Sequence, residues 1–118
     1  KAFRRLAEHE IPGLVAERLA KGETVFLDFK ASWCTTCAAQ ERVINALLAE
    51  DPAYAKAITF INVDWDAYES DPLTVDLAIP RRSTLVVLKG EDELGRIVAG
   101  TARAEIKALM DAALAAST

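Results

Sequence analysis

The pattern of hydrophobic and polar positions divides the first half of the chain into a helix, a strand and a second helix. Apolar residues at helical spacing predict a helix over residues 11–19, closed by the glycine at 22. The run at 25–29 is apolar apart from Asp28, which is typical of a strand covered by helices on both faces. A second helix should begin near Cys34, with apolar pairs four residues apart, and end before Pro52.

The second half of the chain predicts two strand-forming regions and a final amphipathic helix. The predicted elements are a strand at 58–63, a short helix at 72–78 and a hairpin of strands 84–88 and 96–99. The last helix contains Ile106 and Met110 on its apolar face, and Thr101 is its expected N-cap. Residues 3–6 fit a strand or a helix. This order predicts an α/β fold in three layers, α/β/α, around a central mixed sheet of four to five strands that ends in a β-hairpin and a C-terminal helix.

Composition narrows the class of protein. With 118 residues, 52% hydrophobic and 27% charged, the chain is expected to form a single domain over residues 1–118. A net charge of −4 with interspersed signs gives no basic stripe, so neither nucleic acid nor a lipid surface is an expected partner. The apolar runs are far shorter than the ~18 residues of a membrane span, and no membrane insertion is expected. The chain begins with Lys1 instead of methionine, so we expect an upstream segment that was removed or omitted.

The stretch "SWCTTC" contains both cysteines of the chain, Cys34 and Cys37, at a predicted strand-to-helix junction. Backbone N–H groups and the helix dipole at such a junction favour an anion, and they can lower a cysteine pKa from about 8.5 toward 7 or below. Cys34 is therefore a candidate nucleophile, and Cys37, one helical turn later, can resolve the mixed disulfide that Cys34 forms. A zinc site needs four ligands, and the remaining candidate, His9, is distant in sequence, so no metal site is expected within one chain.

A resemblance to a known family follows from these residues. "VFLDFKASWCTTC" resembles the active-site strand and turn of thioredoxin, and the similarity continues through "ITFINVD", "STLVVLKGEDELGRIVAGT" and the closing helix. The lead-in to the cysteines is most similar to the C-terminal domain of the bacterial thiol:disulfide interchange reductase. The resemblance implies a thiol:disulfide oxidoreductase with a thioredoxin fold, whose redox-active disulfide Cys34–Cys37 needs no further cofactor.

The resemblance implies roles for four residues. Cys34 would be the attacking thiol, Cys37 the resolving thiol, Trp33 a contact surface for partners and Asp28 a buried carboxylate. Asp28 also has an argument of its own, because burial of a carboxylate raises its pKa and allows it to accept or return the proton of Cys37. The alternative is a structural aspartate that bonds to neighbouring backbone.

Two departures from the family pattern lie close to the cysteines. Lys30 stands where thioredoxin usually has an aromatic residue, on the same face of the strand as Asp28. Its ammonium group would stabilise the Cys34 thiolate, pair with Asp28 and lower its pKa, or extend into solvent. Thr35 and Thr36 replace the Gly-Pro of thioredoxin, where the dipeptide tunes the redox potential.

A third departure concerns the cis-proline that the family places opposite the cysteines. When "STLVVLKG" is aligned with that strand, the position falls on Ser83, whereas Pro80 is three residues too early. Either the loop bulges so that Pro80 reaches the site, or Ser83 takes the position, and we favour Ser83, preceded by a trans peptide bond. The expected substrate-binding edge then comprises Trp33, Arg82, Ser83 and Thr84, with a positive character.

The predicted function is dithiol–disulfide exchange with the thiols and disulfides of protein partners, more as a reductant than as an oxidant. An upstream protein would supply the electrons, and the chain is expected to be a monomer. The expected location is periplasmic or otherwise exported, with a cytoplasmic thioredoxin as the alternative. Two other functions stay open: a redox-inert binding module that uses Trp33, and a dimer that shares its cysteine pairs around a metal or iron–sulfur cluster.

Overall fold

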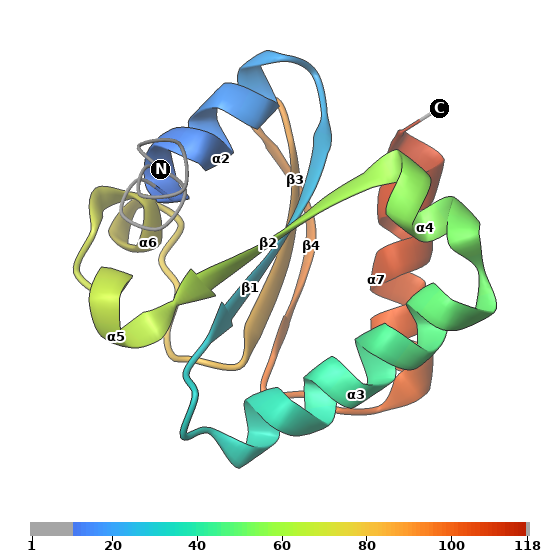
Figure 1. Cartoon of the computed structure of the whole chain (residues 1–118). Coiled ribbons are helices and arrows are strands. Elements are labelled where there is room, and N and C mark those ends of the chain that lie inside the picture. Colours follow the sequence, from blue (N-terminus) through green and yellow to red (C-terminus); the bar gives the residue numbers. More distant parts are fainter. Residues whose placement is uncertain (1–10, 118) are drawn as a thin grey trace, which may run out of the picture.

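The computed structural model describes residues 11–117 and contains a four-stranded sheet between two layers of helices (Figure 1). The strands lie in the order β2 (Ile58–Asp64), β1 (Thr24–Lys30), β3 (Thr84–Lys89) and β4 (Asp92–Val98). The β1–β2 pair is parallel, and the β1–β3 and β3–β4 pairs are antiparallel. The predicted mixed sheet within an α/β/α sandwich is therefore confirmed.

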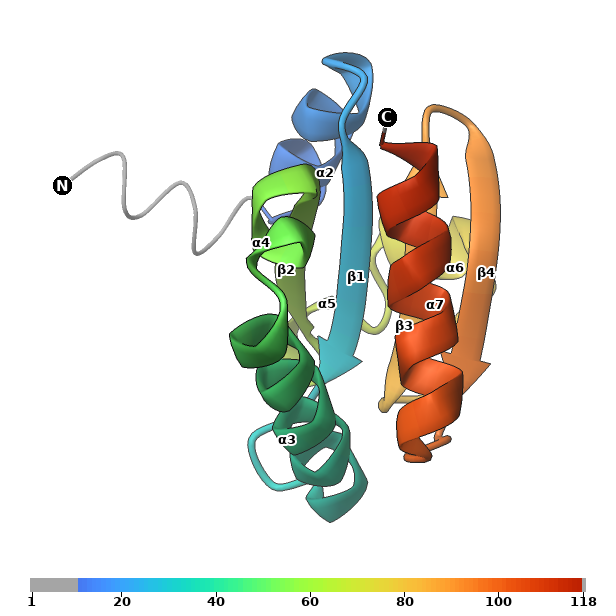
Figure 2. The same cartoon turned by 90° about the vertical axis from the view of Figure 1, so that its right-hand side faces the viewer.

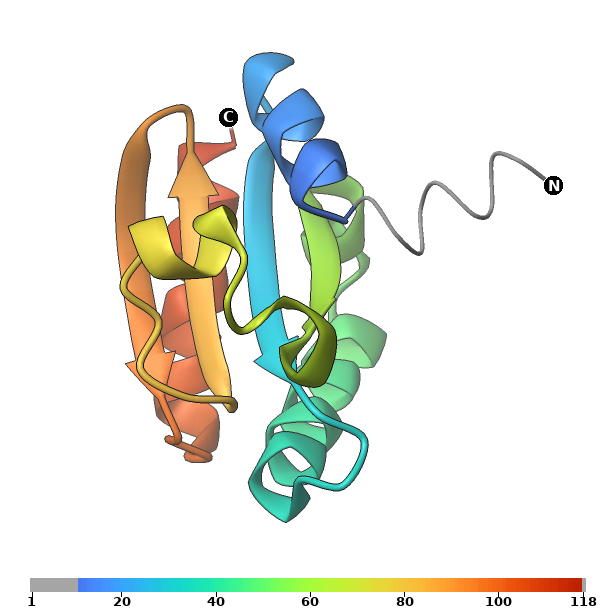
Figure 3. The same cartoon turned by 90° about the vertical axis from the view of Figure 1, so that its left-hand side faces the viewer.

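Helices cover both faces of the sheet. Figure 2 shows the face covered by α3 (Thr35–Glu50), α4 (Pro52–Ala57) and α7 (Arg103–Ala116). Figure 3 shows the opposite face, with α2 (Ile11–Ala20), α5 (Trp65–Tyr68) and α6 (Pro72–Asp76). Each face has its own hydrophobic core, and both cores contain side chains of β1. None of the helices in residues 11–117 is long and apolar enough to cross a membrane.

Strand β1 lies at the centre of the sheet and positions the site. Its side chains alternate between the two cores, with Phe26 toward α3 and α7, and Leu27 and Phe29 toward α2. Both faces are buried, which explains the nearly continuous apolar run in the sequence. Asp28 alternates with Leu27 and Phe29, so it shares the face of Phe26 and lies beneath α3.

The sequence pattern did not predict the short helices α4 and α5 or the correct start of β4. Asp51 is the N-cap of α4. Its carboxylate accepts a hydrogen bond from the Ala53 amide at 3.0 Å, and Pro52 occupies the first turn. Asp64 is the N-cap of α5, where its carboxylate accepts a hydrogen bond from the Asp66 amide. Strand β4 begins at Asp92, earlier than the predicted residue 96, because the chain reverses immediately at Gly90, whose φ is +61°.

The prediction that Thr101 caps the last helix is wrong. Helix α7 begins at Arg103, its N-cap is Ala102, and no side chain makes the capping hydrogen bond. The segment before α7 instead directs the Gly100 carbonyl toward α3, where Gln40 donates a hydrogen bond to it at 2.9 Å. The element predicted around residues 3–6 lies outside the described residues.

Candidate active site

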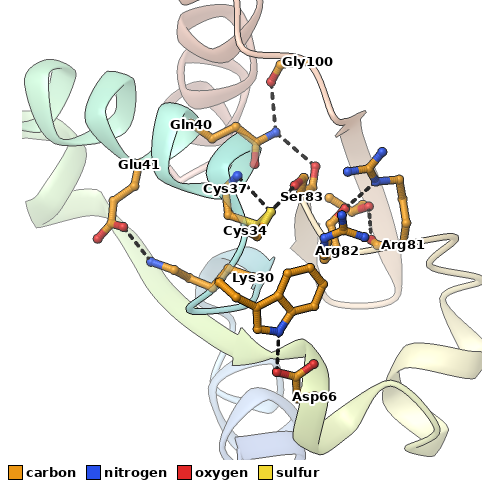
Figure 4. The surroundings of a disulfide bond; sticks show 12 residues. Lys30, Cys34, Cys37, Gln40, Glu41, Asp66, Arg81, Arg82, Ser83 and Gly100 are labelled. Carbon is orange, nitrogen blue, oxygen red and sulfur yellow. Dashed lines mark hydrogen bonds and ion pairs between the residues drawn. A yellow bond between two sulfur atoms is a disulfide. The ribbon is translucent and has the colours of Figure 1, made fainter.

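The two cysteines form a disulfide at the junction between β1 and α3, with their Cα atoms 5.3 Å apart (Figure 4). Cys34 is the N-cap of α3, and its Sγ accepts a hydrogen bond from the Cys37 amide at 3.1 Å. The structure therefore places the Cys34 sulfur where a helix N-terminus stabilises a negative charge.

The two sulfur-bearing residues differ in their access to solvent. Cys34 is 5% exposed and Cys37 is 1% exposed. Trp33, directly before the pair, is 56% exposed. Thr35 and Thr36 lie in the first turn of α3, with Thr35 exposed and Thr36 half-buried. Cys34 is therefore slightly more exposed than Cys37, although both are buried, and the attacking role of Cys34 stays a prediction.

Ser83 faces the disulfide from the start of β3. Its Oγ lies 3.1 Å from Cys34 Sγ and 3.1 Å from Cys37 Sγ. Its φ is +66°, and none of the peptide bonds among residues 11–117 is cis, as expected for the bond before Ser83. Pro80 is exposed and makes no such contact. Of the two alternatives for the proline position, the structure therefore selects Ser83.

Gln40 is a site residue that the sequence pattern did not reveal. It is fully buried in α3, and its Nε2 donates hydrogen bonds to the carbonyls of Ser83 at 3.0 Å and Gly100 at 2.9 Å. This amide joins α3 to the turn that carries Ser83 and to the segment before α7 (Figure 4). A signal was present, because Gln40 lies three residues after Cys37 and is a polar residue on the inner face of the helix.

Asp28 is a buried carboxylate beneath α3, only 5% exposed. Burial raises its pKa from 3.8 to about 6, because the charged form loses hydration, while nearby Lys30 lowers the pKa and Glu41 raises it. Its Oδ1 has no hydrogen-bond partner among the described residues, so the alternative of a structural aspartate bonded to backbone is not supported at this atom. A cavity of about 150 Å³ opens beside Asp28 and is also lined by Lys30, Glu41 and Asn62.

Lys30 extends along α3 and forms an ion pair with Glu41, with Nζ 2.9 Å from Oε1. The side chain of Lys30 is 20% exposed, so the pair lies at the edge of the buried region (Figure 4). The charge of Lys30 lowers the Asp28 pKa, as expected, but Lys30 forms its ion pair with Glu41 and not with Asp28. Glu41 was not a predicted site residue.

The edge beside the disulfide is formed by the exposed Trp33 and the half-buried Arg82. The indole Nε1 of Trp33 donates a hydrogen bond to Asp66 at 2.7 Å, and the Arg82 guanidinium lies 4.5 Å from the centre of the indole ring. These contacts hold Trp33 against the protein while leaving most of its surface open. Thr84, also expected at this edge, is fully buried and donates its hydroxyl to the Arg81 carbonyl at 2.6 Å. The side chain of Thr84 therefore stabilises the turn at Arg81 and is not part of the exposed surface.

The fold and the cysteine pair together define the class of protein. A disulfide at the N-terminus of a helix, on a central strand of a mixed α/β/α sheet, has the chemistry of thiol–disulfide exchange. Within residues 11–117, no group of three or more His, Cys, Asp or Glu side chains is arranged to hold a metal ion.

Comparison with known proteins identifies the family. The thioredoxin family model matches residues 14–112, and the chain belongs to the thioredoxin family. Thioredoxin H5 of Oryza sativa subsp. japonica is 33% identical over 79 residues, which are 67% of this chain and 54% of that protein. The chain thus spans about half the length of this curated relative.

Solved structures agree with this assignment. Trxlp from Edwardsiella tarda EIB202 is 26% identical, with a TM-score of 0.70, and the match covers 82% of this chain and 91% of that chain. The thioredoxin of Fasciola hepatica is 25% identical, with a TM-score of 0.64, and the match covers 86% of this chain and 88% of that chain. As a family member with the Cys34–Cys37 pair in place, the chain has the active site of a thiol–disulfide oxidoreductase.

Proposed function

We propose that this protein reduces disulfides of protein partners through the Cys34–Cys37 couple. The observation that carries the proposal is the position of Cys34 at the N-cap of α3, with the Cys37 amide directed at its sulfur. This position favours the thiolate, which is the nucleophile in disulfide exchange.

The reaction proceeds in two exchanges. The Cys34 thiolate attacks one sulfur of a partner disulfide, the partner S–S bond breaks, and one partner thiolate leaves. Cys37 then loses its proton, attacks Cys34 Sγ and releases the second partner thiolate. The partner gains two electrons, and the protein ends with the Cys34–Cys37 disulfide. An upstream protein dithiol restores the reduced form, and no metal or organic cofactor takes part.

Asp28 is the proposed acceptor of the Cys37 proton. Its pKa of about 6 means that it is mostly ionised near neutral pH, yet close enough to neutrality to hold and return a proton. The cavity beside Asp28 gives water access to the carboxylate, which supports proton exchange with solvent.

The edge formed by the exposed Trp33 and the half-buried Arg82 is the proposed docking surface. Trp33 presents a large apolar surface beside Cys34, and Arg82 adds a positive charge. Ser83, next to Arg82, lies against the sulfurs themselves, so a partner at this edge has its disulfide close to Cys34.

We also propose an exported, periplasmic location, with a cytoplasmic location as the alternative. The support is the resemblance of the lead-in sequence to the bacterial interchange reductase, which implies an exported domain. Fractionation of cells that express the full-length gene, followed by alkylation of free thiols, distinguishes the two compartments.

Reduction of insulin with dithiothreitol as the electron source tests the activity. We expect the wild-type protein to accelerate insulin precipitation and Cys34→Ser to abolish the effect. Cys37→Ser should accumulate a mixed disulfide with insulin through Cys34. A wild-type protein that gives no dithiol-dependent turnover contradicts the proposal and favours the binding module.

A further inference from the structure

The hydroxyl of Ser83 is the one side-chain group that the structure, over residues 11–117, places in hydrogen-bond contact with both sulfurs. It lies 3.1 Å from each Sγ and is fully buried. A hydroxyl has one hydrogen to donate and two lone pairs that accept, so it can serve one sulfur as a donor and the other as an acceptor at the same time.

The backbone holds this hydroxyl in place. The Ser83 N–H donates to the Phe29 carbonyl at 2.7 Å, and the Ser83 carbonyl accepts from the Ala99 amide at 2.8 Å and from Gln40 at 3.0 Å. A proline at this position would lack the N–H and would require a φ near −65°, whereas Ser83 has a φ of +66°. The turn is therefore built for a residue with a free amide, and the serine side chain is directed at the disulfide.

We propose that Ser83 is a catalytic residue that stabilises the reduced form of the couple, an inference that rests on the proposed function. In that form Cys34 is a thiolate, which accepts, and Cys37 is a thiol, which donates. Ser83 then donates its hydrogen to Cys34 Sγ and accepts the Cys37 S–H, which gives the chain Cys37 S–H···Oγ–H···Sγ Cys34. Hydrogen bonds to an ionised acceptor are the stronger kind, so the reduced form gains more from Ser83 than the disulfide does.

Reduction of the Cys34–Cys37 disulfide by a donor dithiol balances in electrons and protons. A donor dithiol loses two electrons and two protons as it becomes a disulfide. The protein takes up the two electrons and one proton as the Cys34–Cys37 bond breaks, giving a thiolate at Cys34 and a thiol at Cys37, and the other proton goes to solvent. Ser83 gains and loses no atoms, so its contribution appears as a shift of the equilibrium.

Two variants separate the hydroxyl from the backbone. Ser83→Ala and Ser83→Gly both remove the hydroxyl, but glycine relieves the positive φ and alanine does not. Both proteins should be more strongly reducing than the wild type, with the equilibrium constant for reduction by glutathione lowered about tenfold, or about 30 mV. Both should also raise the pKa of the Cys34 thiol, followed by thiolate absorbance, by about one unit.

Thr74→Val is the matched control. Thr74 is 1% exposed and donates its hydroxyl to the Tyr68 carbonyl at 2.7 Å, so this variant loses a buried hydroxyl that serves no sulfur. Its redox equilibrium and Cys34 pKa should equal those of the wild type.

Unchanged values in both folded Ser83 variants overturn the inference, and so does a shift in one of them alone, because the backbone then causes it. A failure of the wild type to reduce insulin is a different result, which removes the proposed function. The redox equilibrium and the thiol titration need no protein partner, so they still decide the role of Ser83.

Discussion

The disulfide lies between two regions that stabilise their surroundings in different ways. The Ser83 region consists of Ser83, Gln40 and Ala99 and is held by hydrogen bonds between neutral groups. The Asp28 region consists of Asp28, Lys30 and Glu41 and contains a buried carboxylate beside an ion pair. Neutral hydrogen bonds are insensitive to pH between about 4 and 8, whereas a buried carboxylate with a raised pKa is not. In the disulfide form, the Ser83 region therefore fixes geometry, and the Asp28 region responds to protons.

The largest expected effect comes from the Asp28 carboxylate. The ordinary pKa of this group is 3.8, and its pKa in the folded protein is about 6, so between these values the folded protein binds more protons than the unfolded chain. The contribution of Asp28 to the free energy of unfolding therefore falls by about 2 kcal/mol as the pH rises from about 4 to about 6, and by about 3 kcal/mol over the wider range from about pH 3 to about pH 7. Asp28→Asn should remove this loss and make the protein more stable than the wild type at pH 7.

Urea unfolding of both proteins from pH 4 to pH 7 measures the effect. The effect of Asp28 is the difference between the free energies of unfolding of the two proteins. Four other carboxyl groups have a lowered pKa and change the stability of both proteins in the opposite direction: Glu23, Glu50, Glu93 and Asp111. The two proteins should be nearly equal at pH 4 and diverge by pH 6. A constant difference over this range contradicts the raised pKa.

The next largest effect is expected at Gln40. Gln40→Leu keeps the size of the side chain but removes both hydrogen bonds from Nε2, which leaves the Gly100 carbonyl without this donor. We expect a loss of about 2 kcal/mol in the free energy of unfolding, equal at pH 5 and pH 8 because no charge is involved. Asn45→Ala, at an exposed position of the same helix, should change the stability by less than about 0.5 kcal/mol. A loss at Gln40 that depends on pH would remove the contrast between the two regions.

A smaller effect is expected at Ala99, whose amide holds the Ser83 carbonyl and whose φ is +66°. Ala99→Gly should stabilise the protein by about 1 kcal/mol, because glycine adopts this conformation without steric cost. Ala108→Gly, in the middle of α7, should destabilise it by a similar amount. Thermal unfolding of both variants tests the opposite signs, and destabilisation by both would show that Ala99 is not strained.

The smallest expected effects are at the Lys30–Glu41 ion pair. Lys30 lowers the Asp28 pKa and Glu41 raises it, so Lys30→Met should raise that pKa and Glu41→Gln should lower it. Each change should be less than about one unit, because the pair is partly exposed. Carboxyl chemical shifts followed by NMR against pH measure both. Shifts in the same direction would contradict the electrostatic description of the Asp28 region.

The sequence predicted those parts of the molecule that depend on local pattern. Periodicity predicts the two-sided burial of β1 and the cysteine pair at the start of α3. The family resemblance predicts the position of Ser83 opposite the sulfurs. Asp51 and Asp64 are local capping signals for α4 and α5, so the sequence also contains the information that begins these two helices. Gln40 and Asp66 were harder to find, because their partners are distant in sequence and only the tertiary fold brings them together.

The redox equilibrium of the Cys34–Cys37 couple tests the reducing role of the protein most directly. The protein is equilibrated with glutathione buffers of graded ratio, free thiols are alkylated, and the intact mass is recorded. We expect both cysteines to be alkylated together in one reversible two-electron transition, at a potential near the thioredoxin end of the range, about −270 mV. A transition near the oxidising end, about −120 mV, would contradict the role as a reductant. A disulfide that glutathione and dithiothreitol both fail to open would contradict the exchange chemistry itself.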